Sequence, residues 1–326
     1  MDLFEKKHIR PMLIGKDSDP FDSPDFLFEL KLDGERCFAY LGSNETLLIN
    51  RNGNRVLNKV PELERIHKQT KGKTIIDGEL IVMKNDKPDF ELIKNRILAT
   101  NKYRIQSDSQ KFPVTFVAFD ILYLDGEDLS KRFLKERKEI LQDTVSDSDR
   151  LSLSRVVMEE GIKFFDLAAQ SGLEGIIAKK LDSLYYPGKR TKEWMKIKNI
   201  QDGEFYICGY ILRNDKIASL ILGEYTDHIE NLIALRNGGI KGDEPNRHGE
   251  LIFCGRVTIA KSNPDLNIIF NHSKSKKPLF NDVSLRSNEQ AVWLKPNLMC
   301  TVEYLEITEK GHLRQPIYKG LRLDKS

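Results

Sequence analysis

Apolar and polar residues alternate along short segments in the first two thirds of the chain. Near the start, Phe28, Leu30 and Leu32 are separated by single polar residues, which is the pattern of a strand with one buried face. Similar segments predict further strands, and apolar residues at helical spacing predict two helices. The predicted strands are 26–32, 74–83, 115–124, 175–180 and 193–198, and the predicted helices are 128–141 and 161–170.

The pattern changes after residue 198. A short polar segment contains Asp202-Gly203, a pair typical of turns, and predicts a hinge. Beyond it, short strands separated by turn residues predict a small closed barrel such as an OB-fold. The strands expected there are 205–212, 217–222, 232–236, 255–259 and 300–308, with one helix near 287–294.

Composition limits the class of protein. The chain has 326 residues, of which 40% are hydrophobic, enough for two domains with separate cores. No apolar run has the length of a membrane span, and the N-terminus lacks the apolar core of a signal peptide, so we expect a cytoplasmic protein. The net charge of +3 requires any nucleic-acid contact to come from local basic patches. Four widely separated cysteines argue against a structural zinc site.

Lys31 is the main candidate for a nucleophile. It lies on the polar face of its strand between Glu29 and Asp33, and Gly34 follows. A lysine amine attacks phosphorus only when it is deprotonated, which desolvation or nearby cations promote. For this segment alone, a solvated lysine on an edge strand is the alternative.

A second cluster of cations lies near residue 198. Strand alternation places Lys196 and Lys198 on one face and Met195 and Ile197 on the other, and Arg190 precedes them. Two ammonium groups on one face repel each other unless an anion lies between them. A phosphate is the natural anion for such a pair.

Other residues interrupt apolar strands. Glu79 follows Asp77 in a buried strand, so it needs a partner such as a ribose hydroxyl or a cation. Glu174 begins an apolar strand and could bind magnesium through its oxygens. Phe119 could stack on a base or belong to the core, and Arg51 lies in an Asn-Gly turn that by itself predicts only a hairpin. The glycine-rich motifs of Rossmann and P-loop sites are absent.

Taken in order, these motifs resemble those of the covalent nucleotidyltransferases, which comprise ATP-dependent DNA ligases, RNA ligases and mRNA capping enzymes. The motifs are Lys31-Leu32-Asp33-Gly34, Arg51-Asn52-Gly53, Asp77-Gly78-Glu79, Phe119-Asp120, Glu174-Gly175, Lys196-Ile197-Lys198 and Arg322-Leu323-Asp324-Lys325. The segment from Trp293 to Arg322 is especially similar to the ligase domain of bacterial end-joining DNA ligases.

The resemblance implies an ATP-dependent DNA ligase of the α+β class. Its adenylation domain of antiparallel sheets with flanking helices would span 1–200, and an OB-fold β-barrel would span 201–326. Lys31 would attack the α-phosphate of ATP and form lysyl-AMP. AMP would then pass to the 5′-phosphate of a DNA break, and the 3′-hydroxyl would seal the strand. The implied cofactors are ATP and Mg²⁺, with Mn²⁺ as an alternative.

The family also implies a role for each remaining site residue. Glu29 would read the adenine amino group, Arg36 and Arg51 would contact ribose and phosphates, Glu79 would bind ribose, Phe119 would stack on adenine, Glu174 would bind the metal, Arg190, Lys196 and Lys198 would neutralise phosphates, and Arg322 and Lys325 would close over the pyrophosphate.

Two enzymatic alternatives share the lysine chemistry: an RNA ligase and, with less support, a GTP-dependent capping guanylyltransferase. A DNA-binding module that has lost catalysis is a third. We expect nicked or broken duplex DNA as substrate in repair or recombination. We also expect a monomer with no membrane partner, associated with the nucleoid when bound to DNA. Since few residues precede Lys31, we expect no upstream DNA-encircling domain and a possible Ku-like end-binding protein as a separate partner.

Overall fold

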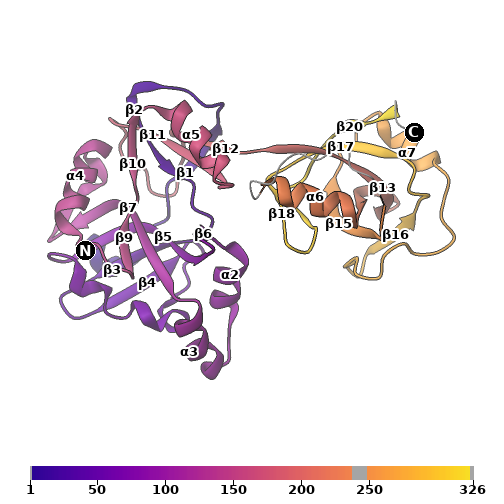
Figure 1. Cartoon of the computed structure of the whole chain (residues 1–326). Coiled ribbons are helices and arrows are strands. Elements are labelled where there is room, and N and C mark those ends of the chain that lie inside the picture. Colours follow the sequence, from indigo (N-terminus) through magenta and orange to yellow (C-terminus); the bar gives the residue numbers. More distant parts are fainter. Residues whose placement is uncertain (1, 237–247, 324–326) are drawn as a thin grey trace. The chain divides into compact units, whose positions relative to one another are not determined.

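The computed structural model describes residues 2–236 and 248–323. Contacts divide the chain into two units, Met1–Lys198 and Asn199–Ser326, which Figure 1 draws in sequence colours. The division falls two residues before the domain boundary expected from the sequence.

The first unit contains a five-stranded sheet with the order β1-β12-β11-β2-β10. Its strands are β1 (Leu13–Asp17), β12 (Arg190–Lys198), β11 (Gly175–Lys180), β2 (Ser23–Leu30) and β10 (Val156–Glu159). Only the β1–β12 pair of this sheet is parallel. Helix α5 (Gly161–Gln170) packs on one face, where Phe28, Ala168, Ile176 and Ile197 form a core cluster.

A seven-stranded sheet forms the rest of the first unit. Its strands are β4 (Thr46–Asn50), β3 (Glu35–Leu41), β5 (Thr74–Lys84), β7 (Val114–Leu124) and β8 (Glu127–Asp128), with β6 (Lys87–Pro88) on β5 and β9 (Leu151–Leu153) on β7. The helices of this part are α2 (Phe90–Leu98), α3 (Lys102–Lys111) and α4 (Leu134–Thr144). Ile93 of α2 and Leu141 of α4 join the core beneath one face of this sheet.

The two sheets of the first unit share a further core cluster. Trp194 of β12 is buried there with Phe38 and Tyr40 of β3, and with Phe4 of the short helix α1 (Leu3–Lys6). The polar face of the five-stranded sheet is therefore held close to one face of the seven-stranded sheet. Most of the residues predicted to carry the chemistry lie on these two faces.

The second unit is a β-rich OB-type domain, as expected. Its long central strand β13 (Gln201–Arg213) pairs with β14 (Lys216–Tyr225), β16 (Glu289–Trp293) and β17 (Met299–Tyr304). β15 (Leu251–Thr258) continues the sheet beside β14, and β20 (Ile317–Leu321) continues it beside β17, while β18 (Glu306–Ile307) and β19 (Leu313–Arg314) form a small hairpin. The helices are α6 (Thr226–Arg236) and α7 (Asp265–Asn271).

Most of the predicted elements are confirmed, and β11 and α5 have the predicted bounds. The helix expected over 128–141 is instead a 3₁₀ turn (Leu129–Lys131) followed by α4. Its first turn is interrupted because Asp128 caps the 3₁₀ turn and Glu136 accepts the N–H of Phe133 at the start of α4.

Three predictions in the second unit are wrong. Residues 232–236 belong to helix α6, because Ile229, Leu232 and Ile233 recur at helical spacing and pack on the core. Residues 289–293, expected near a helix, form β16 and pair with β13. The turn expected at Asp202-Gly203 is instead part of β13, where these residues pair with Glu303 and Val302, while the hinge in this segment stays a prediction. Between the end of β12 and the start of β13, residues 199 and 200 have no strand structure.

Candidate active site

The register of the five-stranded sheet gathers the predicted cations on one face. Glu29 of β2 lies opposite Ile177 of β11, which in turn lies opposite Lys196 of β12, and Lys198 lies opposite Gly175. Lys31 continues this register, because its N–H donates to the carbonyl of Gly175 at 2.9 Å. The core residues of the same strands point to the other face, so the alternation predicted for 195–198 is confirmed.

Lys31 is paired with the carboxylate predicted to bind a metal. Its Nζ lies 2.6 Å from Oε1 of Glu174, whose side chain is only 6% exposed. Gly175 allows this arrangement: it has a φ of +134°, and a Cβ there would lie 2.1 Å from the carbonyl oxygen of Ile197. β11 can thus approach β12 closely while Glu174 reaches Lys31.

The two lysines of β12 supply positive charge next to this pair. Lys196 Nζ lies 3.1 Å from a carboxylate oxygen of Asp17, on the parallel strand β1. Burial, together with the neighbouring ammonium of Lys196, lowers the pKa of Lys198. A group whose charged form is disfavoured in this way is stabilised when an anion such as phosphate binds.

Glu79 approaches Lys31 from the other sheet. Gly34, after the Lys31 strand, makes room for it, since a Cβ on Gly34 would lie 2.8 Å from Cγ of Glu79. Burial raises the pKa of Glu79 to about 8, although the positive charges of Arg36 and Lys31 act in the opposite direction. The carboxyl group is therefore mainly protonated near neutral pH, which suits hydrogen bonding to a ribose hydroxyl.

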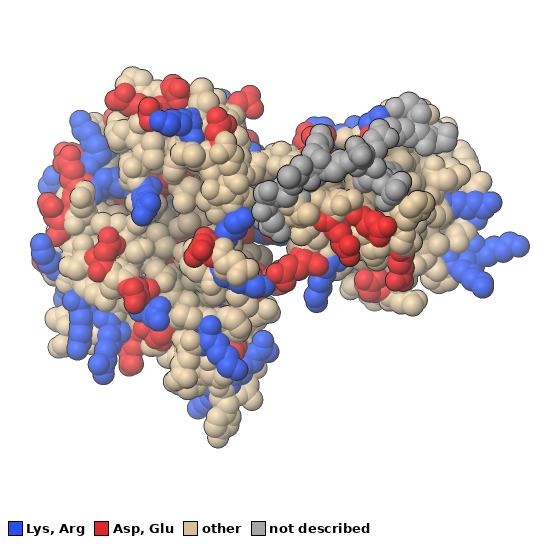
Figure 2. Space-filling model, viewed as in Figure 1, with Lys and Arg blue, Asp and Glu red and all other residues tan. Residues whose placement is uncertain are grey.

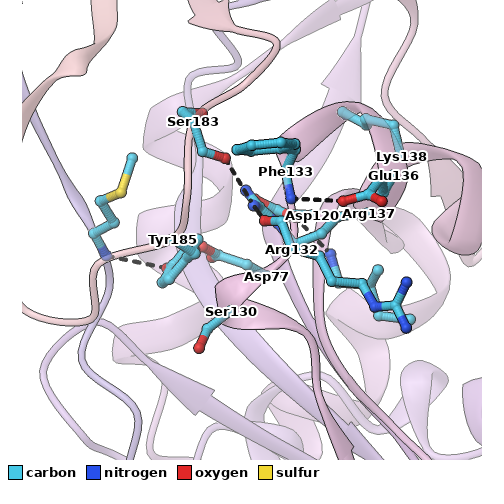
Figure 3. Close-up of polar contacts among 12 residues, drawn as sticks. Asp77, Asp120, Ser130, Arg132, Phe133, Glu136, Arg137, Lys138, Ser183 and Tyr185 are labelled. Carbon is cyan, nitrogen blue, oxygen red and sulfur yellow. Dashed lines mark hydrogen bonds and ion pairs between the residues drawn. The ribbon is translucent and has the colours of Figure 1, made fainter.

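Arg36 is held by a buried polar network. Its Nε and Nη2 donate to the two carboxylate oxygens of Asp77 at 3.0 and 2.6 Å, and its Nη1 donates to the carbonyl of Met12. The hydroxyl of Tyr185 also donates to Asp77, at 2.6 Å. Figure 3 shows Asp77 and Tyr185 side by side. Contact of Arg36 with ribose or phosphate remains a prediction, since Asp77 already orients its guanidinium.

Phe119 lies at a β-bulge, where β7 has one residue more than its partner. Asp77 pairs with Asp120 and Gly78 pairs with Ala118, so Phe119 is the additional residue. Bulges of this kind redirect a side chain. The ring has Arg36 Cζ at 5.3 Å and Lys179 Nζ at 4.3 Å from its centroid. Phe119 therefore lies among the polar residues of both sheets and is only partly buried.

Glu29 is enclosed by two lysines. Its side chain is 3% exposed, Lys138 of α4 contacts one carboxylate oxygen, and Lys179 of β11 contacts the other. Burial acts to raise the pKa of Glu29, but the two ammonium groups outweigh it and lower this pKa. Burial also lowers the pKa of Lys179 to about 8. The carboxylate is thus held ionised in a buried setting.

The remaining predicted residues lie elsewhere. Arg51 is exposed in the turn after β4, where its N–H is bonded to the carbonyl of Arg36. Arg190 is exposed at the start of β12 and donates to the carbonyl of Ile14. Arg322 belongs to the second unit, where it is paired with Glu204 of β13. Lys325 lies outside the described residues.

Sequence reasoning missed both lysines around Glu29. Lys179 carries a signal, because it is a charged residue in the buried strand β11. Lys138 carries none, since it occupies an ordinary polar position of α4 and lies 109 residues from Glu29 in the chain.

The donor set fits a magnesium ion that is shared with a substrate. Among residues 2–236 and 248–323, no group of three or more His, Cys, Asp or Glu side chains could hold a metal alone. Magnesium is usually bound by one or two carboxylates together with substrate phosphates and water. Glu174, next to Lys31, is such a carboxylate. The four cysteines are buried and unbridged.

Comparisons with known proteins match both units. The family model described as "ATP dependent DNA ligase domain" matches residues 11–198, and that described as "ATP dependent DNA ligase C terminal region" matches residues 242–325. A DNA ligase of Thermococcus fumicolans is 30% identical over 98% of this chain and 56% of its own length. The multifunctional non-homologous end joining protein LigD of Pseudomonas aeruginosa is 28% identical over 92% of this chain and 34% of its own length.

Solved structures give the same match. A mycobacterial DNA ligase D complexed with ATP and MES has a TM-score of 0.55 and 27% identity, covering 100% of this chain and 97% of that chain. The ligase domain of LigD from M. tuberculosis has a TM-score of 0.54 and 26% identity, with the same coverage. The chain thus spans between about a third and just over half of the first two curated relatives, but nearly all of these solved ligase structures.

Proposed function

The chain belongs to the ATP-dependent DNA ligase family, and we propose that it seals 5′-phosphate/3′-hydroxyl breaks in DNA through a lysyl-AMP intermediate. The observation that carries this proposal is the ion pair between Lys31 and Glu174, with Lys196, Lys198 and Glu79 grouped around it. A nucleophile, an acid and cations for phosphate are what transfer of a nucleotidyl group requires.

The first step is attack of the Lys31 amine on the α-phosphorus of ATP. The bond from this phosphorus to the pyrophosphate oxygen breaks, and a phosphoramidate to AMP forms. Lys31 begins this step in an ion pair with Glu174, so its proton must pass to this carboxylate or to water as the amine turns toward the phosphate. Lys196 and Lys198 lie on the same face and neutralise the negative charge on the phosphate oxygens.

Several residues supply binding and orientation. Phe119 offers the stacking face for adenine, Glu29 accepts from its amino group, and Glu79 binds the ribose. Arg36 and Arg51 contact ribose and phosphates, and Arg190 neutralises the phosphates together with Lys196 and Lys198. Glu174 would hold Mg²⁺, which would supply Lewis-acid polarisation of the phosphates, and Mn²⁺ is an alternative ion.

The second unit completes the proposed cycle. Arg322 and Lys325 contribute to the pyrophosphate end of ATP during self-adenylation, and residues near the junction of the units permit the motion. AMP then passes to the 5′-phosphate of a nicked or broken duplex. On the face drawn in Figure 2, basic and acidic side chains are interspersed, so DNA is bound through local cations.

The pathway and partners extend beyond the family assignment. The likeness to LigD supports a role in end joining, with a Ku-like protein as recruiting partner and a monomeric ligase at the nucleoid. No helix in the described part of the chain has the length and apolar character needed to cross a membrane.

The test is covalent labelling with α-labelled ATP or GTP and magnesium, followed by denaturing electrophoresis. We expect label from ATP in the wild type and none in Lys31→Ala, whereas Lys94→Ala, which removes an exposed lysine of α2, keeps it. Nicked DNA and nicked RNA then distinguish a DNA ligase from an RNA ligase. Label from GTP favours the capping reaction. Absence of label in folded wild type that is not already adenylated contradicts the proposal.

A further inference from the structure

Lys138 is a partly buried cation that belongs to none of the ligase motifs. It lies on α4, and its Nζ contacts Oε1 of Glu29, a residue of β2. Its side chain is 14% exposed. A lysine loses side-chain entropy and hydration when it is placed this way, so the contact requires a structural or functional explanation.

Arg137, the residue before Lys138, fixes the position of helix α4. Arg137 donates two hydrogen bonds of 2.8 Å to Asp120 of β7 and further bonds to the carbonyls of Arg132 and Ser183. Figure 3 shows Arg137 reaching Asp120 from α4, with Lys138 beside it on the helix. Since Arg137 already anchors α4, the fold does not need Lys138 for this purpose.

The lysines control the charge and direction of the Glu29 carboxylate. Lys138 contacts Oε1 and Lys179 contacts Oε2, so the carboxylate plane is fixed from two sides. Each carboxylate oxygen accepts about two hydrogen bonds, and one contact on each leaves capacity for a further donor. The buried carboxylate is therefore oriented, ionised and still able to accept.

This carboxylate is close to both the nucleophile and the aromatic ring. Glu29 precedes Lys31 by two residues on the same face of the sheet. Lys179, its second partner, lies 4.3 Å from the centroid of Phe119. A base stacked on Phe119 would thus have its polar edge near Glu29.

We infer that Lys138 is a positioning residue for purine recognition: it holds the Glu29 carboxylate where this group accepts a hydrogen bond from the exocyclic 6-amino group of adenine. The inference rests on the proposed function. Adenine presents a donor at this position, whereas guanine presents a carbonyl oxygen that a carboxylate repels. Lys138 therefore contributes to the choice of ATP although it need not touch the nucleotide.

The test compares two nucleotides in two proteins. Self-adenylation is followed by intact-protein mass spectrometry with ATP and with purine riboside triphosphate, which lacks the 6-amino group, at subsaturating concentrations. A hydrogen bond to a charged acceptor gives the wild type about a 10- to 100-fold preference for ATP. In Lys138→Met we expect this preference to fall to within about threefold, mainly because the rate with ATP falls.

Matched variants separate positioning from general damage. Lys135→Met removes an exposed lysine from the same helix and should keep the wild-type preference, while Lys138→Arg should restore most of it. If Lys138→Met is not folded by circular dichroism, Lys138→Gln is measured instead.

The outcomes distinguish this inference from the proposed function. If Lys138→Met slows both nucleotides equally, or if the wild type does not prefer ATP, the inference is wrong although self-adenylation stands. If neither nucleotide labels the wild type, the proposed function fails and the inference fails with it.

Discussion

Two buried carboxylates, Asp120 and Glu29, are bound by neighbouring residues of one helix but differ in their surroundings. Asp120 forms a bidentate ion pair with the guanidinium of Arg137, and both side chains are fully buried. Glu29 instead meets two ammonium groups, from Lys138 and Lys179. One cluster is neutral overall, whereas the other has an excess positive charge.

The difference indicates which cluster holds the fold and which serves the site. The guanidinium of Arg137 also donates to two backbone carbonyls, so its donors are largely used within the protein. The Glu29 cluster contains two ammonium groups and one carboxylate, so it keeps an excess positive charge next to Phe119 and Lys31. Buried excess charge is costly without a partner, and functional sites are where proteins retain it.

The first prediction concerns the neutral cluster and has the largest effect. Arg137→Met should lower the free energy of unfolding by about 3–5 kcal/mol, because it leaves the Asp120 carboxylate buried without its cation. Denaturation in urea measures the loss. In the double variant Asp120→Asn, Arg137→Met, much of the lost free energy of unfolding should be recovered. A double variant that is destabilised by more than the sum of the two single variants would contradict a neutral structural pair.

The sequence predicts the residues proposed to react or bind better than the residues that hold them in position. Lys31, Glu174 and Lys196 are recognisable because they lie in or directly beside short apolar strands: Lys31 follows β2, Glu174 precedes β11 and Lys196 lies within β12. Lys138 could not be predicted, because its contact with Glu29 joins residues that lie 109 apart in the sequence.

The errors in the second unit have a similar cause. Residues 289–293 have no strong period, and their strand state follows from pairing with β13 and from Glu289, which accepts from Arg213 and Arg256. The Asp202-Gly203 pair looks like a turn locally, but the long strand β13 includes it. In both places, tertiary pairing outweighs local propensity.

The second prediction tests a single carboxyl group of the site, Glu79. Its pKa is raised by burial from 4.5 to about 8, so the native state binds a proton that the unfolded state releases between these pH values. The free energy of unfolding should therefore fall as pH rises from about 4.5 through 8. Glu79→Gln removes this dependence. The difference in free energy of unfolding between Glu79→Gln and the wild type should therefore favour the variant by at least about 1 kcal/mol more at pH 9 than at pH 5. Urea denaturation at both pH values measures this, and an unchanged difference would show that Glu79 is not held protonated.

The last prediction concerns the more exposed pair of Arg322 and Glu204 in the second unit, whose side chains are 33% and 18% exposed. Glu204→Gln should change the free energy of unfolding by less than about 1 kcal/mol, because solvent screens such pairs, and added salt should reduce the change further. If Arg322 contributes to self-adenylation, it must leave Glu204 to reach pyrophosphate. Arg322→Ala should then slow self-adenylation by on the order of 100-fold, whereas Glu204→Gln should not slow it. If Arg322→Ala and Glu204→Gln slow self-adenylation equally, then the intact ion pair matters for the reaction, and movement of Arg322 away from Glu204 does not. The ion pair would then belong with Asp120 and Arg137 as part of the fold.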